Sequence, residues 1–150
     1  MAFRFAALAV LLGSIAPAMA ADWQVIRANE QARLSIDRGS VKRTGDEVAF
    51  RFLIDLRKGE GANRASPGHR SIVTSARVRC KARTIAILDS EGFLGNGGQG
   101  VAISRSPPRR GEPAFVNLEE GTSDEDLWRH FCDRKATPAK APPGKADAGK

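Results

Sequence analysis

The residues of this chain that could do chemistry are two cysteines and two histidines, namely Cys80, Cys132, His69 and His130. Such residues could supply a catalytic thiolate with a base, a metal site or a disulfide. Catalysis needs a reduced thiolate with a base within hydrogen-bond reach. A metal site would need all four side chains to converge, without any C-x-x-C or H-x-x-x-H spacing. The first twenty residues predict export, as described next, and the cysteines of an exported chain are expected to be oxidised. We therefore expect neither an enzyme nor a metal site here, and no cofactor.

The first twenty residues predict export. They have Arg4 as their only charged side chain, then an apolar run, and end in Ala18-Met19-Ala20 before Ala21. This is the layout of a secretory signal peptide cleaved between Ala20 and Ala21. Glycine, serine and proline interrupt the apolar run before it reaches the roughly 20 residues of a membrane-spanning helix. We expect a soluble mature chain in the periplasm or at the cell surface, without a lipid anchor or a transmembrane segment.

Export makes a disulfide the expected state of the cysteines. Thiols oxidise outside the cytoplasm, and Cys80 and Cys132 have no third cysteine to compete with them. His130 lies two positions before Cys132, so on a helix it points away from the face that carries the cysteine. We expect His130 to be solvated.

The chain is basic and ends in a polar tail. Its formal net charge is +7, and removing residues 1–20 takes away one arginine and no acid, which leaves +6. An exported basic protein is expected to meet anionic partners. Residues 133–150 have no aromatic or large aliphatic side chain, so they predict a disordered basic tail. The expected organisation is a signal peptide over 1–20, one domain over 21–132 and this tail.

Most of the domain has the alternation of β-strands. In residues 47–57 apolar side chains alternate with charged ones, which predicts one buried and one solvated face. The apolar face consists of Val48, Phe50, Phe52, Ile54 and Leu56, and the charged face of Glu47, Arg51, Asp55 and Arg57.

Shorter segments predict the other strands. One begins at Trp23, one covers 33–37 and ends in a turn over 37–40, and weaker ones cover 101–103 and 114–118. Residues 58–68 predict a loop. Residues 71–90 are too long for one strand, so a hairpin with its turn at 81–83 is expected. Its first arm directs Val78 and Cys80 inward and Arg77 and Arg79 outward.

One segment, residues 122–132, predicts a convincing helix in the mature chain. Thr122 can cap it, with Glu125 three positions on in a capping box. The apolar stripe that follows is Leu127, Trp128, Phe131 and Cys132. An antiparallel sheet with one open apolar face needs a cover, and this helix is the candidate for it.

A glycine-rich segment, residues 95–100, matches the G-x-G-x-x-G pattern of dinucleotide-binding proteins. That pattern works only where the glycine turn opens a helix whose N-terminus holds the pyrophosphate. Here β-branched residues and then Pro107 and Pro108 follow, so no helix is expected. We interpret the segment as a flexible loop that binds no dinucleotide.

Arginines of the predicted hairpin and of a proline-rich loop are the candidate anion-binding residues. Guanidinium groups hold phosphate or sulfate by charge-assisted hydrogen bonds. Nucleic acid is disfavoured because the aromatic residues mostly occupy apolar-face positions and cannot stack bases. The simpler interpretation, which we favour for these arginines, is a merely solvated outer face. The candidates are Arg77, Arg79, Arg83, Arg109 and Arg110, with Lys81 beside them.

Several stretches together resemble the surface-adhesin protein E family of Gram-negative bacteria. They are, in this order, ADWQVI, LSIDRGSVKRTGDEVAFRFLID, VRCKARTIAIL and the terminal LWRHFC, and the similarity covers roughly Trp23 to Cys132. The resemblance implies an α+β fold in which a C-terminal helix closes a curved antiparallel sheet of about six strands. It also implies that Cys80 and Cys132 are joined, and that host matrix proteins such as vitronectin and laminin are partners.

Two functions follow as expectations. The first is an exported, non-enzymatic binding protein of the adhesin E type that contacts host matrix proteins through its surface, as a monomer or a homodimer. The second is a periplasmic envelope protein that engages anionic cell-surface polymer through its basic faces and tail.

Overall fold

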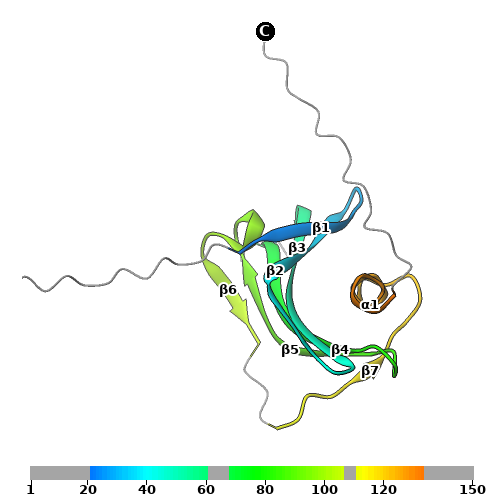
Figure 1. Ribbon diagram of the computed structural model, residues 1–150. Coiled ribbons are helices and arrows are strands. Elements are labelled where there is room, and N and C mark those ends of the chain that lie inside the picture. The colour runs from blue at the N-terminus through cyan, green and yellow to red at the C-terminus, as the bar shows by residue number, and fades with distance from the viewer. Residues whose placement is uncertain (1–20, 61–67, 107–110, 134–150) are drawn as a thin grey trace, which may run out of the picture.

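An antiparallel sheet curves around one helix (Figure 1). The computed structural model describes residues 21–60, 68–106 and 111–133. The elements are β1 (Trp23–Ala28), β2 (Ala32–Thr44), β3 (Glu47–Glu60), β4 (His69–Arg79), β5 (Thr84–Phe93), a 3-10 turn η1 (Asn96–Gly98), β6 (Ala102–Arg105), β7 (Val116–Asn117) and α1 (Ser123–Cys132). The predicted signal peptide, residues 134–150 of the predicted tail, Arg109 and Arg110 lie outside the described residues.

From β1 to β6, each strand pairs with the next one in the sequence. The order across the sheet is β1-β2-β3-β4-β5-β6, and the two-residue β7 pairs with the far end of β5. All of these pairings are antiparallel. The α+β fold, with a curved antiparallel sheet of about six strands, is therefore confirmed. No helix among the described residues has the length and apolar character needed to cross a membrane.

The core lies between the inner face of the sheet and α1. The alternation predicted for β3 places Val48, Phe50 and Phe52 there, each at most 4% exposed. Leu127 of α1 is fully buried against them, with Trp128 and Phe131 packed at its sides. The predicted apolar stripe of the helix is the surface that covers the sheet.

The outer face of the sheet has a smaller buried area of its own. Leu53 and Val73 are paired across β3 and β4 and lie on this face, and both are buried. They lie under η1, where the side chain of Val73 approaches Gly98. The glycine-rich segment thus forms a defined turn on the outer face instead of the flexible loop that we predicted.

Hydrogen bonds explain why the glycine-rich segment is held. The backbone N–H of Gly97 donates to Oδ1 of Asp55 at 2.7 Å, and that of Gly98 donates to the Ser71 hydroxyl at 3.0 Å. The same Ser71 hydroxyl donates to the carbonyl oxygen of Gly95. Sheet residues therefore bind the turn through its backbone, which the glycine count alone did not indicate.

The expected turn at residues 37–40 is wrong, because β2 runs on to Thr44. Its register against β3 shifts between Asp37 and Lys42, as at a β-bulge. Gly39 donates from its backbone to Oδ1 of Asp37 at 3.1 Å. The Ser40 hydroxyl accepts the backbone N–H of Arg51 at 2.8 Å and so keeps the two strands connected. β3 likewise extends three residues into the predicted loop, to Glu60.

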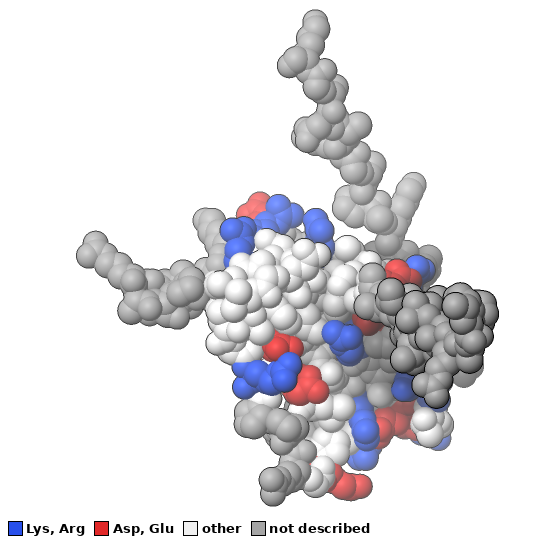
Figure 2. All heavy atoms as spheres, turned by 90° about the vertical axis from the view of Figure 1, so that its left-hand side faces the viewer, with Lys and Arg blue, Asp and Glu red and all other residues white. Residues whose placement is uncertain are grey.

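Charge is unevenly spread over the surface. The face on which β6 lies carries a broad area without charged side chains (Figure 2). Mostly Lys and Arg lie along its upper border, and charged side chains of both signs lie along its lower border. β6 itself is exposed at all four of its residues. Val101 just before it is 65% exposed and Ile103 within it is 39% exposed.

Candidate functional site

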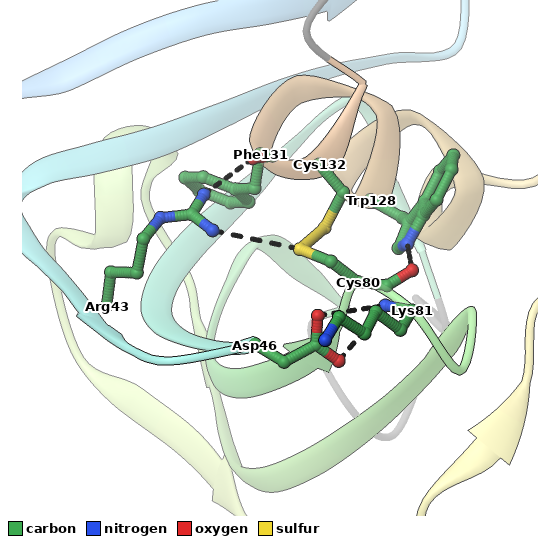
Figure 3. Close-up of a disulfide and its surroundings, with 7 residues drawn as sticks. All are labelled: Arg43, Asp46, Cys80, Lys81, Trp128, Phe131 and Cys132. Carbon is green, nitrogen blue, oxygen red and sulfur yellow. Dashed lines mark hydrogen bonds between the residues drawn. A yellow bond between two sulfur atoms is a disulfide. The ribbon is translucent and has the colours of Figure 1, made fainter.

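A disulfide joins the last residue of α1 to the hairpin turn after β4. The Cα atoms of Cys80 and Cys132 are 5.2 Å apart and their sulfurs are bonded, as Figure 3 shows. Neither cysteine is free. The predicted disulfide is confirmed, and the predicted hairpin turn at 81–83 is correct, with Arg83 in the left-handed conformation at a φ of 51°.

Hydrogen bonds on both sides of the disulfide hold the same junction together (Figure 3). The indole nitrogen of Trp128 donates to the carbonyl oxygen of Cys80 at 3.1 Å. On the other side, Nη2 of Arg43 in β2 donates to the carbonyl oxygen of Phe131 at 2.6 Å. This places a cation at the negative end of the α1 dipole, which stabilises the helix.

A cavity of about 610 Å³ opens beside the disulfide. Its polar side chains come from Arg43, Asp46 and Lys81, and Phe131 and the two cysteines supply the rest with Gly45. The Asp46 carboxylate is engaged, since it accepts the backbone N–H of Lys81 at 3.0 Å and 3.1 Å. Because the sulfurs are bonded to each other, this cavity offers charged groups and no thiolate nucleophile.

Glu125 is a buried acid that sequence reasoning interpreted only as part of a capping box. Thr122 does cap the helix, and its hydroxyl accepts the backbone N–H of Glu125 at 3.3 Å. The Glu125 carboxylate accepts from the backbone N–H of Gly121 at 2.8 Å and from the Arg129 guanidinium at 2.8 Å. These hydrogen bonds lower the pKa of Glu125 below its ordinary value.

The two histidines do not form a site with the cysteines. His69 begins β4, whereas Cys80 follows the other end of that strand. His130 is half-buried, and its ring lies edge-on to the Phe131 ring with 5.0 Å between the ring centroids. The expectation of a solvated side chain is therefore wrong. Burial lowers the pKa of His130. Among the described residues no three His, Cys, Asp or Glu side chains are grouped as metal ligands.

Two of the predicted anion-binding arginines lie together on the outer face of β4. Arg77 and Arg79 both pair with the Glu47 carboxylate at 3.3 Å. The guanidinium of Arg79 also lies over the Phe115 ring, 3.7 Å from its centroid. An acidic partner therefore already offsets part of their charge.

Arg83 lies apart from that pair, against the helix. Its guanidinium is 3.7 Å from the Glu125 carboxylate and 4.7 Å from the centroid of the Trp128 ring. The structure thus brings Arg77 and Arg79 together and does not add Arg83 to them. Arg109 and Arg110 are among the residues that the structure does not describe.

A second basic cluster was missed by sequence reasoning. Arg33 of β2, Arg57 of β3 and Arg70 of β4 line one cavity of about 290 Å³ with Asp55, Leu56 and Asn96. The three arginines come from three strands and are far apart in the sequence. The charge alternation in β3 singled out Arg57, but the pairing of strands was needed to bring Arg33 and Arg70 to it.

Comparisons with known proteins agree with this architecture. The sequence model of the family described as Surface-adhesin protein E matches residues 23–133. Two crystal structures of Haemophilus influenzae protein E are similar in fold. One, from the non-typeable organism, is 19% identical, covers 79% of this chain and 82% of that one, and gives a TM-score of 0.53. The other, crystal form II, is 16% identical, with 72% and 91% coverage and a TM-score of 0.53. No curated protein sequence matches the chain.

Proposed function

The chain belongs to the surface-adhesin protein E family, and from this membership we propose that it is an exported, non-enzymatic protein that binds host matrix proteins. The family match is the observation that carries the proposal, because it spans nearly all of the domain, from residue 23 to 133. The protein acts, on this proposal, in the periplasm or at the cell surface after removal of residues 1–20.

The face that carries β6 is the proposed contact surface. Protein interfaces are depleted of charge at their centre and ringed by polar residues. The uncharged area of Figure 2, with charged side chains of both signs along its borders, has this arrangement. Val101 and Ile103 are exposed aliphatic side chains at β6. β6 is also the last strand of the sheet within the described residues, so its free edge could pair with a strand of a partner or of a second copy.

Support for a binding role also comes from the chemistry of the cavities. The larger one is lined by a bonded disulfide and by Arg43, Asp46 and Lys81. The smaller one is lined by arginines and an Asp55 carboxylate that accepts two hydrogen bonds. Neither combines a nucleophile with a base in the way that acyl or phosphoryl transfer requires.

Direct binding is the experiment that tests the proposal. The oxidised chain beginning at Ala21 is passed over immobilised vitronectin and laminin, with serum albumin as the negative surface. We expect saturable binding to at least one matrix protein and none to albumin. Absence of binding to either matrix protein, by a chain whose circular dichroism shows a folded sheet, contradicts the proposal. Sedimentation of the same sample gives the oligomeric state.

A second candidate function is binding of anionic polymer of the cell envelope. The observation in its favour is that Arg33, Arg57 and Arg70 have no acidic partner among the described residues. The basic tail over residues 133–150 would add to the attraction. Deleting that tail should reduce co-sedimentation with isolated envelopes, and an unchanged level speaks against a contribution of the tail.

A further inference from the structure

The arginine cavity lies at one end of the sheet, away from the disulfide. In the register of β2 against β3, Arg33 is opposite Asp55. Arg43, whose Nη1 lies 3.9 Å from the Cys80 sulfur, is ten residues further along β2. Arg57 follows Asp55 by two positions and so lies on the same face of β3. Arg70 of β4 comes just before Ser71, which is opposite Asp55, at a point where the register of β3 against β4 becomes irregular. Arg70 is placed at the cavity by its lining and not by the alternation of the strand. Three neighbouring strands therefore each bring one guanidinium to this cavity.

The three guanidinium groups are available to a ligand. None of them forms an ion pair or a side-chain hydrogen bond with another described residue, and all three residues are exposed. The one carboxylate in the lining, that of Asp55, is turned to the glycine-rich turn. It accepts the backbone N–H of Gly97 at 2.7 Å and the amide of Asn96 at 3.4 Å. Three positive charges against one negative charge leave an excess of two.

We propose that Arg33, Arg57 and Arg70 form a binding site for the sulfate or phosphate ester of an anionic saccharide. A guanidinium presents two parallel N–H donors that match the oxygens of such an ester. The volume of about 290 Å³ lies at the lower end of the range for ligand cavities. It suits one ester group with the sugar that carries it.

The lining argues against other ligand classes. Leu56 is the one apolar residue of the lining, so there is no pocket for an acyl chain. No aromatic ring lines the cavity, so there is no surface on which a nucleobase could stack. Hydroxyl-rich saccharides need neither an apolar pocket nor an aromatic stacking surface. They carry sulfate or phosphate esters at cell surfaces.

The test measures saccharide binding by isothermal titration calorimetry of the chain from Ala21 to Lys150 at about 0.15 M salt, where exposed charges are well screened. A heparin hexasaccharide supplies sulfate esters and a glucosamine disaccharide bisphosphate supplies phosphate esters. The variant is the triple Arg33→Ala, Arg57→Ala, Arg70→Ala. We expect the native chain to bind at least one probe and the triple variant to bind it at least about tenfold more weakly, since charge-assisted hydrogen bonds are lost. The probe that binds identifies the kind of ester.

A control variant of equal charge separates a site from general attraction. The triple Arg38→Ala, Lys42→Ala, Arg105→Ala also removes three positive charges, from exposed residues that lie outside the cavity lining and are not among the predicted anion-binding arginines. We expect it to keep affinity within about threefold of the native chain, since exposed charges at a distance contribute little. Should the first triple fail to fold, the doubles Arg33→Ala, Arg57→Ala and Lys42→Ala, Arg105→Ala give the same comparison.

Two results would contradict the proposed saccharide site. One is that neither saccharide binds the native chain saturably. The other is that both charge-matched variants lose affinity equally, which is the behaviour of diffuse attraction. The proposal rests on the same arginines as the second candidate function, binding of envelope polymer, and names the ester group that they would recognise. That function can still fail in the envelope assay while the saccharide titration succeeds. The proposal does not rest on the adhesin role, because matrix-protein binding at the β6 face is measured separately.

Discussion

The indole nitrogen of Trp128 donates a hydrogen bond of 3.1 Å to the carbonyl oxygen of Cys80, although 48 positions separate the two residues. Trp128 lies one turn before Cys132, which is bonded to Cys80 through sulfur. The helix and the hairpin turn are therefore joined twice at the same place, once covalently and once by a hydrogen bond. This double connection defines how α1 lies in the curve of the sheet.

The disulfide is expected to contribute strongly to stability. It closes a loop with a sequence separation of 52, and on the chain-entropy account this is worth about 4 kcal/mol. The double variant Cys80→Ala, Cys132→Ala should lose roughly that free energy of unfolding in a urea titration. Under denaturing, non-reducing conditions the native chain should show no free thiol. Two titratable thiols in the native chain, or a double variant as stable as the native chain, would contradict this.

Packing of α1 on the sheet is tested by Leu127. This side chain is fully buried in the core, so Leu127→Ala should reduce the free energy of unfolding by about 2–5 kcal/mol through lost burial and the cavity left behind. The control is Val116→Ala in β7, whose side chain is 57% exposed and should cost less than about 0.5 kcal/mol. If both variants lost the same free energy of unfolding in the urea titration, α1 would not be packed as described.

The glycine-rich turn offers a matched pair of glycines. Gly97 and Gly98 both have a φ of +71°, but an added Cβ at Gly98 would lie 2.8 Å from Cγ2 of Val73, whereas at Gly97 nothing lies closer than 3.9 Å. Both alanine variants should lose about 1–2 kcal/mol of the free energy of unfolding, because alanine disfavours the left-handed backbone. Gly98→Ala should cost about 1–3 kcal/mol more because of the contact. Equal costs in chemical denaturation would show that the turn does not press on the sheet.

The buried Glu125 predicts a pH dependence of stability. Its pKa in the folded chain is lowered by the hydrogen bonds from Gly121 and Arg129, so the unfolded chain binds more protons in the window between the two pKa values. Its stabilising effect is fully present above the ordinary glutamate pKa and is lost as pH falls through the lowered one. Glu125→Gln should therefore lower the melting temperature near neutral pH, and the difference should shrink in acid. A difference in melting temperature between the native chain and Glu125→Gln that stays constant from about pH 7 to pH 3 would refute this role of Glu125.

Local patterns predicted the strands, the helix and the disulfide because each depends on neighbouring residues or on a small choice of partners. The alternation in residues 47–57 and the cap at Thr122 are of this kind. The bulge after Asp37 was predicted as a turn because its residues are those of turns, and only the pairing of Ser40 with β3 shows that the strand continues.

The candidate sites were less predictable because they depend on which strands lie side by side. Arg77 and Arg79 were correctly placed on the outer face of β4, but their common partner Glu47 lies 30 and 32 positions away. No pattern in the sequence singled out Arg33 or Arg70, since neither lies in a run of charged residues. Strand register, which follows from the whole fold, brings them to one cavity.

The most direct test of the central claim, that this adhesin-family chain binds matrix proteins through the face that carries β6, compares two pairs of exposed aliphatic residues. Val101→Ser, Ile103→Ser alters that face, and Val25→Ser, Val116→Ser alters residues of β1 and β7 that are also exposed. Binding to immobilised vitronectin and laminin is measured for both variants and the native chain. We predict that the first pair weakens binding at least about tenfold, as central interface residues do, and that the second leaves it unchanged. Equal affinities for both variants, or no binding by the native chain, would contradict the claim.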